Sequence, residues 1–198
     1  MGYFQQNEIE LYAEQVSKNG NPYCGDSYYY VSTNDYFVCV LADGLGSGKY
    51  AYESSHVVVE IVEENHHEDV ETLMALCNNA LQRKRGAAVA IIKAYYHSKE
   101  FVYSCVGNIR FYMYSPEGKI TYPLPVTGYL SGRPQKYQTK RYTYESNSRF
   151  LLHSDGLNIS GVKSVLQRYP TLHSTMHDIQ SLVDETADDT TYIVGSLL

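Results

Sequence analysis

Two short segments of this chain are apolar at every position, and they restrict the possible folds more than any other feature. Residues 37–41 read FVCVL and residues 88–92 read AVAII. A strand built from either segment presents apolar side chains on both of its faces, because successive side chains of a strand alternate between faces. A sheet that contains such strands must therefore be covered on both sides.

The expected secondary-structure elements are grouped rather than alternating. Amphipathic spacing predicts helices over residues 48–64 and 69–82, and helical patterns return around residues 158–168 and 174–186. Grouping of this kind indicates an α+β fold, which we predict to be a four-layer α-β-β-α sandwich of two antiparallel sheets flanked by helices. The predicted strands are residues 27–33, 35–42, 87–96, 100–107, 109–115, 136–145, 149–155 and 190–198.

Length and charge exclude several classes of protein. A chain of 198 residues suits one domain, which we expect to span residues 1–198 as a monomer. The net charge of -6 argues against nucleic acid or an anionic membrane as the main partner. No apolar run approaches the roughly 20 residues of a membrane span, and the polar N-terminus does not resemble a signal peptide. The scattered cysteines suit free thiols, so we expect a cytoplasmic protein.

Aspartates stand where several predicted strands begin or end. FVCVLADGL and RFLLHSDGL share one plan, in which an apolar strand and a small residue lead to Asp43 and Asp155, respectively. Asp26 precedes another strand, and Asp188 and Asp189 precede the last one. A single Asp-Gly pair is common turn chemistry, but matched copies with further aspartates at strand starts favour a shared site.

Such a cluster requires cations, because like charges a few ångströms apart raise one another's pKa. An all-oxygen set favours Mg²⁺ or Mn²⁺ over Zn²⁺, and it is large enough for two ions. The glycines that follow Asp43 then let a backbone carbonyl approach a metal and leave room for a substrate.

Six segments, in order along the chain, resemble motifs of the metal-dependent protein phosphatases (the PPM family, type 2C serine/threonine phosphatases). CGDS resembles the first acidic motif of the family, ADGLGSG its Asp-Gly-x-Gly motif and RGAAVAII its Gly-Thr-Thr-Ala strand. VGNIRFYMYSPEGK resembles the Val-Gly-Asp-Ser-Arg hairpin, HSDGL the Ser-Asp-Gly motif and DDTTYIV the closing Asp-Asn-x-Thr motif. The resemblance covers nearly the whole chain and implies the PPM-type phosphatase fold.

The resemblance also implies roles for the aspartates. Asp43 would bridge two cations and act in catalysis together with Asp26, while water activated between the cations attacks phosphorus. Asp189 stands where many members have asparagine, so it ranks behind the others. The implied metal ligands are Asp43, Gly44 through its carbonyl, Asp155, Asp188, Asp26 and Asp189.

The implied substrate is a protein that carries phosphoserine or phosphothreonine. Residues 122–139, YPLPVTGYLSGRPQKYQT, are not a general family motif and resemble the bacterial members that act on stressosome proteins. The expected partners are therefore phosphorylated stressosome scaffold proteins, whose dephosphorylation damps the general stress sigma-factor pathway.

The chain departs from the family pattern at several positions. Gly25 stands where many members have an acidic or amide residue, and Leu45 stands where some have a histidine. No arginine precedes the first motif to hold the phosphate. Arg85, at the end of the run RKR, together with Arg133 and Lys136 in the Pro/Gly-rich loop, are candidates for substrate binding, and solvated surface charge is the alternative.

Two rival functions remain open. The chain could be a catalytically weak phosphatase-fold module that binds the stressosome, although the intact aspartate set argues against this. It could also be a nucleotide-binding module, but Asp43 would repel a phosphate unless a cation lies between them. The Pro/Gly-rich loop over residues 123–137 is predicted to hold a fixed shape, either as a specificity loop beside the metal site or as a packed structural loop.

Overall fold

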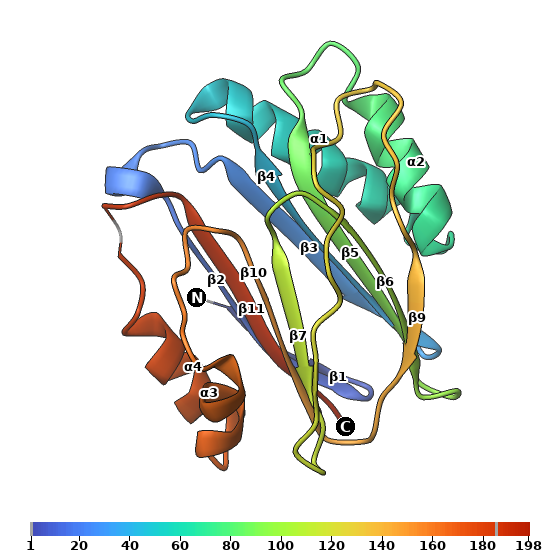
Figure 1. The fold of residues 1–198 in the computed structure, drawn as a ribbon, viewed down its shortest axis with the longest axis vertical. Helices are drawn as coiled ribbons and strands as arrows, with labels where there is room; N and C mark the ends of the chain where they lie inside the picture. Colours follow the sequence, from blue (N-terminus) through green and yellow to red (C-terminus); the bar gives the residue numbers. More distant parts are fainter. Residues whose placement is uncertain (1, 185) are drawn as a thin grey trace.

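The computed structural model describes residues 2–184 and 186–198, which form two antiparallel sheets and four α-helices (Figure 1). One sheet has six strands in the order β1 (Gly2–Gln6), β2 (Ile9–Val16), β11 (Thr190–Leu197), β10 (Ser148–His153), β7 (Arg110–Tyr114) and β8 (Ile120–Thr121). The other has five, in the order β3 (Asp26–Ser32), β4 (Tyr36–Gly44), β5 (Ala87–Tyr95), β6 (Glu100–Val106) and β9 (Lys140–Thr143). The helices are α1 (Lys49–Asn65), α2 (Val70–Ala80), α3 (Val162–Arg168) and α4 (Leu172–Gln180), and a short 3₁₀ turn, η1, covers Lys18–Gly20.

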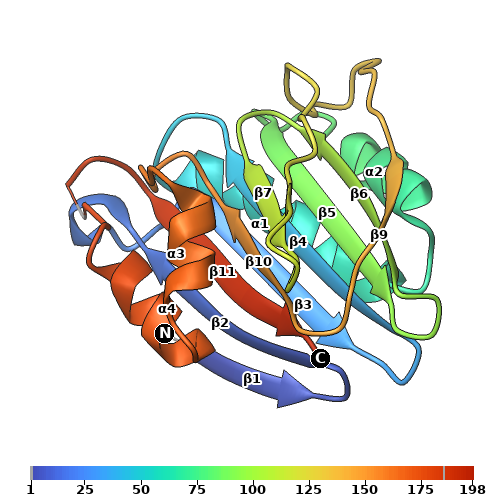
Figure 2. The same ribbon diagram turned by 60° about the horizontal axis from the view of Figure 1, so that its bottom comes forward.

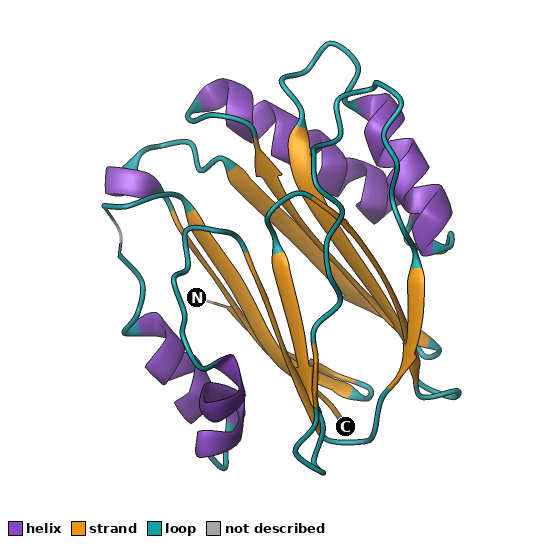
Figure 3. Cartoon of the chain, in the orientation of Figure 1, coloured by secondary structure: helices purple, strands orange, loops and turns teal. Residues whose placement is uncertain are grey.

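The elements form four layers, so the predicted α-β-β-α sandwich is confirmed. Helices α1 and α2 cover the outer face of the five-stranded sheet, and α3 and α4 cover the outer face of the six-stranded sheet (Figures 1 and 3). The turned view shows α3 and α4 lying across β2, β11 and β10 (Figure 2). Separate apolar cores fill the space between the sheets and the space under each helix pair.

Strand β4 shows why its sequence is apolar on both faces. Phe37, Cys39 and Leu41 point into the core between the sheets, whereas Val38 and Val40 pack in the core beneath α1 and α2. All of these side chains are fully buried. Because successive side chains point to opposite faces, one apolar strand contributes to the core on each side of its sheet.

The N-terminal hairpin was not predicted from the sequence. β1 and β2 pair antiparallel and extend the six-stranded sheet beyond β11. Ile9, Leu11 and Ala13 enter the core between the sheets and alternate with more exposed residues. This period-two pattern was available in the sequence, but the many polar residues between the apolar positions obscured it.

Several predicted boundaries were wrong for local reasons. The strand expected over residues 136–145 is only Lys140–Thr143. Helix α3 begins at Val162 because Gly161, in the left-handed conformation, is its N-cap, and α4 begins at Leu172 because the Thr171 hydroxyl accepts a hydrogen bond from Ser174 N. Helix α4 ends at Gln180, well before the expected residue 186.

Lys93 is a buried cation in β5 that binds the carbonyl groups at the C-terminal end of α1. Its Nζ donates to the carbonyl oxygens of His66, His67 and Glu68 at 2.8, 3.0 and 2.7 Å and lies 4.0 Å from the centre of the Tyr36 ring. These carbonyls follow the last turn of α1, where free acceptors and the negative end of the helix dipole favour a cation. Lys93 therefore attaches α1 to the sheet beneath it.

Replacing Lys93 with methionine should reduce the free energy of unfolding by about 2 to 4 kcal/mol, because the buried carbonyls lose a charged donor while the side-chain volume is kept. Urea denaturation followed by circular dichroism would measure this change. Lys140→Met, at an exposed position of β9, serves as the control and should change stability by less than about 0.5 kcal/mol. Equal effects of the two substitutions would contradict the proposed role of Lys93.

Candidate metal centre

The aspartates predicted from the sequence lie at one end of the sandwich, at the seam between the two sheets. Asp26 begins β3 and stands directly opposite Asp43 near the end of β4. In the other sheet, Asp155 follows the end of β10, and Asp188 and Asp189 precede the start of β11, which pairs with β10. These strand ends lie together at the upper left of Figure 1.

Asp26 is a buried carboxylate that connects the two sheets. Its side chain is 2% exposed, and its Oδ2 accepts a hydrogen bond of 2.7 Å from the Ser154 hydroxyl. The same hydroxyl oxygen accepts a hydrogen bond of 2.9 Å from Thr191 N. Burial raises the pKa of Asp26 to about 7, the hydrogen bonds oppose this rise, and the charges of Asp189 and Asp155 add to it.

Asp43 is a mostly buried carboxyl group on which all the other aspartates of the cluster act. Burial, together with the charges of Asp26, Asp155, Asp188 and Asp189, raises its pKa to about 8. A carboxyl group in this position holds a proton near neutral pH unless a cation compensates the surrounding charge. The four neighbouring aspartates therefore lie close enough to Asp43 to raise its pKa, while their roles as metal ligands stay predictions.

Asp155 and Asp188 occupy the more open side of the cluster. Asp155 Oδ2 accepts a hydrogen bond of 2.6 Å from the Asn108 side chain. Burial and the charge of Asp188 raise the pKa of Asp155, and the bond from Asn108 opposes the rise. Asn108 follows Gly107 in the VGN segment, and no pattern in the sequence indicates that its side-chain amide orients an aspartate.

Asp189 is held by the backbone on both of its oxygens. Oδ1 accepts from Lys18 N and Oδ2 accepts from Gly25 N, each at 2.8 Å. A Cβ atom on residue 25 would lie 2.9 Å from Asp189 Oδ2, so a glycine is needed for this approach. The departure from the family pattern at Gly25 thus has a structural reason, and Asp189 fixes the segments that surround the cluster.

Gly44 allows the first turn of α1 to pack against the end of β4. A Cβ atom at this position would lie 2.0 Å from the carbonyl oxygen of Ala51. Gly44 N donates to Gly25 O at 3.0 Å, which joins the first acidic segment to the Asp-Gly turn. A larger residue here would move α1 away and shift the backbone next to Asp43.

A cleft of about 330 Å³ opens beside Asp43. Asn108 and Gly107 form one part of its wall, and the Pro/Gly-rich loop contributes another. Its lining residues are Asp43, Leu45, Ala88, Gly107, Asn108, Pro125, Thr127 and Gly128. The loop therefore lies beside the aspartate cluster, as the sequence prediction of a specificity loop requires.

The same loop is also packed, so the two alternatives for it are not exclusive. Leu130 is fully buried, and its N and O atoms form hydrogen bonds of 2.9 Å with Ala87 O and N. Val126 N donates to Cys105 O, and Val126 O accepts from Gly107 N. The loop is thus anchored to β5 and β6 on both sides of the short stretch that faces the cleft.

The structure brings together two of the three predicted substrate-binding cations. Arg85 and Arg133 line one pocket of about 240 Å³, together with Arg83 and Lys84. Lys136 is exposed on the same loop but is not among the residues that line this pocket. Arg133 thus lies against the run RKR, from which it is separated by nearly 50 positions in the sequence.

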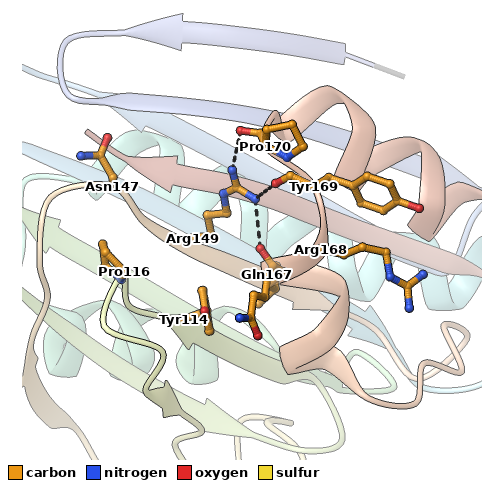
Figure 4. Close-up of a pocket in the computed structure, with 9 residues that line it drawn as sticks. Tyr114, Pro116, Asn147, Arg149, Gln167, Arg168, Tyr169 and Pro170 are labelled. Carbon is orange, nitrogen blue, oxygen red and sulfur yellow. Dashed lines mark hydrogen bonds between the residues drawn. The ribbon is translucent and has the colours of Figure 1, made fainter.

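A larger cavity of about 460 Å³ lies elsewhere, between β10 and the α3–α4 connection (Figure 4). Its central cation, Arg149, donates to the carbonyl oxygens of Leu166, Tyr169 and Pro170. These bonds attach the connection to the sheet and use the guanidinium donors. The cavity therefore has a structural role and does not compete with the aspartate cluster as a site.

The aspartate cluster suits hard divalent cations. The predicted ligands are carboxylate oxygens and the Gly44 carbonyl, and burial, together with the charges of neighbouring aspartates, raises the pKa values of Asp26 and Asp43. Among residues 2–184 and 186–198, no three His, Cys, Asp or Glu side chains are close enough together to form a metal-binding group by themselves.

The described part of the chain contains no helix long and apolar enough to cross a membrane.

Comparisons with known proteins agree with this arrangement. Residues 33–194 match the family model described as Stage II sporulation protein E (SpoIIE). The chain is 41% identical over 98% of its length to phosphoserine phosphatase RsbX of Bacillus subtilis, and it covers 98% of that protein. A crystal structure of RsbX in complex with magnesium superposes with a TM-score of 0.96 at 40% identity and covers 100% of this chain and 99% of that one.

A more distant structure has the same fold. The catalytic domain of the serine/threonine protein phosphatase PstP, in complex with two manganese ions, is 15% identical and superposes with a TM-score of 0.76 over 95% of this chain and 97% of that one. The fold, the order of the motifs and the family match lead to one conclusion: the chain belongs to the SpoIIE family of PPM-type phosphatases.

Proposed function

We propose that residues 1–198 form a single metal-dependent protein serine/threonine phosphatase domain that hydrolyses phosphoserine or phosphothreonine on stressosome proteins. The observation that carries this proposal is the cluster of aspartates at the seam of the sheets, together with 41% identity to a phosphoserine phosphatase. Action on stressosome proteins would place the protein in the cytoplasm, where we expect it to act as a monomer.

The metals are Mg²⁺ or Mn²⁺, and the proposed number is two ions, bound by carboxylates from both sheets. Asp43 is the proposed bridging ligand, Gly44 contributes its carbonyl, and Asp155 and Asp188 hold the side of the cluster formed by the six-stranded sheet. Bound cations would neutralise charge that develops on the transferred phosphoryl group and supply a nucleophilic water at neutral pH.

The residues of the chain itself provide orientation and room for the substrate. Ser154 holds the carboxylate of Asp26, and Asn108 holds that of Asp155, so neither carboxylate rotates freely. The cleft lined by Asp43, Asn108 and Thr127 gives the phosphorylated side chain a place beside the cluster. Asp26, buried with a pKa raised to about 7, ionises fully only when nearby positive charge favours its charged form.

The first test is hydrolysis of para-nitrophenyl phosphate with and without Mn²⁺ or Mg²⁺. Metal-dependent release of nitrophenol would support the phosphatase and argue against both rival functions. A protein that binds stressosome scaffold proteins but hydrolyses neither this ester nor a phosphoprotein would instead be a binding module. Nucleotide binding without hydrolysis would favour the nucleotide-binding alternative.

The hydrogen bond from Ser154 to Asp26 provides a second test. In Ser154→Ala the carboxylate loses its side-chain donor, so the Mg²⁺ concentration for half-maximal activity should rise about tenfold, as for other residues that orient metal ligands. Metal titrations of activity and calorimetric Mg²⁺ binding would both report the change. Ser160→Ala, at an exposed position beyond Asp155, is the control, and an equal shift in that variant would contradict the assignment.

A further inference from the structure

A basic pocket lies next to the aspartate cluster and has no part in the reaction described above. It measures about 240 Å³, and its lining residues are Arg83, Lys84, Arg85, Tyr129, Ser131 and Arg133. The first three come from the connection between α2 and β5, and the other three come from the Pro/Gly-rich loop. These segments are the green and gold loops at the top of Figure 1.

The pocket is held in shape by contacts beneath it. Asn78 Oδ1 accepts hydrogen bonds of 3.1 Å from Ser131 N and from Gly132 N, and Asn78 Nδ2 donates to Arg133 O at 2.9 Å. Leu130, anchored to Ala87, fixes the neighbouring residue of the loop. The backbone that carries Tyr129, Ser131 and Arg133 is therefore held in place before a ligand binds.

The positive charge of the pocket is mostly uncompensated. Among the ion pairs of the described residues, only Lys84 has a carboxylate partner here, with its Nζ 3.6 Å from Glu53. Arg83, Arg85 and Arg133 have none within that part of the chain, and Arg85 lies 5.1 Å from the centre of the Tyr50 ring. This concentration of unpaired cations occurs on a chain whose net charge is -6.

Arg83 has an unusual backbone conformation. Its φ is 65°, in the left-handed region that residues other than glycine rarely occupy. Such a conformation costs roughly 1 kcal/mol or more and is often found at functional positions. Here it places an arginine at the rim of the pocket.

The pocket is within reach of the segment that leads away from Asp43. A Cβ atom on Gly46 would lie 2.7 Å from Arg85 Nη1, and Gly46 is at most roughly 11 Å from Asp43 along the backbone. Gly128 lines the cleft beside Asp43, and the next residue, Tyr129, lines the basic pocket. An extended peptide advances about 3.4 Å per residue, so a group two to four residues from the phosphorylated side chain would reach the pocket.

We propose that the basic pocket binds a second anionic group of the phosphoprotein substrate, two to four residues from the phosphoserine or phosphothreonine, and so selects acidic or doubly phosphorylated sequences. The inference rests on the proposed phosphatase function and adds a determinant of its specificity. The guanidinium group of arginine forms paired hydrogen bonds with carboxylates and with phosphates alike. The expected ligand is therefore an anionic side chain, of either kind, on the same peptide as the phosphorylated residue.

The test uses synthetic phosphoserine peptides with three kinds of flank: glutamates at positions two to four on either side, a second phosphoserine in that range, or glutamines as neutral counterparts. For the wild type we expect kcat/KM to be about tenfold higher with an anionic flank than with the neutral one, and the ratio to shrink as salt rises from 0.05 to 0.3 M. A preference for the second phosphoserine alone would identify phosphate rather than carboxylate as the anion.

Two variants remove the positive charge of the pocket by different routes. Arg133→Glu reverses a charge on the loop, and Arg83→Gly removes one where glycine also relieves the unfavourable φ, so its folding is not at risk. In both variants, kcat/KM for peptides with an anionic flank should be close to kcat/KM for the peptide with the neutral flank. Lys163→Glu, an equal charge reversal at an exposed position of α3, is the control and should keep the wild-type ratio.

Fluorescence polarisation with labelled peptides in EDTA measures the affinity for each flank in the absence of hydrolysis. The same preference should appear in Kd, so the pocket is tested even if no ester is hydrolysed. A wild type that binds and hydrolyses all flanks equally, or a ratio lowered as much by Lys163→Glu as by Arg133→Glu, would overturn the inference about the pocket. Absence of metal-dependent hydrolysis of every peptide, with the binding preference intact, would overturn only the proposed phosphatase function.

Discussion

In an Asp43→Asn variant we expect kcat/KM for para-nitrophenyl phosphate to fall by about a thousandfold, which corresponds to roughly 4 kcal/mol of transition-state stabilisation. Asparagine keeps the size of the side chain but removes the charge at the position that faces all the other aspartates of the cluster. Steady-state assays at saturating Mn²⁺ and at saturating Mg²⁺ would measure the loss.

The control for this substitution is Asp35→Asn, in the exposed turn between β3 and β4, which should change kcat/KM less than twofold. Circular dichroism should show that both variants are folded. Activity of Asp43→Asn within tenfold of the wild type would exclude Asp43 from the mechanism and, with it, the bridging role.

The second large effect concerns the stability of the metal-free protein as a function of pH. The folded-state pKa values of Asp26 and Asp43, about 7 and about 8, lie above the unfolded value of 3.8. The folded state therefore binds more protons than the unfolded state between these limits, and stability falls as pH rises through this window. Between pH 6.5 and pH 8 the free energy of unfolding should decrease by about 2 kcal/mol in EDTA.

His153 affects stability in the opposite direction, but mainly at lower pH. Burial lowers its pKa from 6.5 to about 4, so its unfavourable protonation reduces stability as pH falls below 6.5. Above that pH the imidazole is mostly neutral in both the folded and the unfolded state. The change in the free energy of unfolding between pH 6.5 and pH 8 is therefore due to Asp26 and Asp43. Urea denaturation at pH 6.5, 7.25 and 8 would measure it.

Millimolar Mg²⁺ should remove this decrease in the free energy of unfolding, because a cation favours the charged carboxylates. In EDTA, Asp43→Asn should reduce the decrease by about two thirds, which is the share of the carboxyl group with the higher pKa. A stability that rises with pH over this range in the metal-free wild type would contradict the charge repulsion on which the site is argued.

Most of the fold and the positions of the aspartates could be predicted from the sequence, because each depends on a local pattern. The continuous apolar runs of β4 and β5 require cover on both faces, and Asp43 and Asp155 follow apolar strands that had to end at a sheet edge. The hairpin formed by β1 and β2 was missed because its apolar residues are few and its exposed face carries charge.

The parts of the site that could not be predicted depend on contacts between distant segments. Asn108 acts on Asp155, and Asn78 brings Arg133 against Arg83, through side-chain bonds that span long stretches of sequence. Lys136 and Arg133 are equally basic in the sequence, and only the path of the anchored loop places one of them in the basic pocket. The sequence identifies both residues as candidates, but it does not indicate which of them lines the pocket.

The position of the aspartates at the seam of the sheets has a consequence for how the protein tolerates change. Asp26 and Asp43 belong to one sheet, and Asp155 and Asp188 follow or precede strands of the other. The spacing between these pairs therefore depends on the thickness of the apolar layer between the sheets, formed by side chains such as Leu41 and Phe150, as well as on the bond from Ser154 to Asp26. Adding or removing a single methyl group in that layer would alter the distance between the carboxylate pairs, so turnover would respond to mutations that never touch the site.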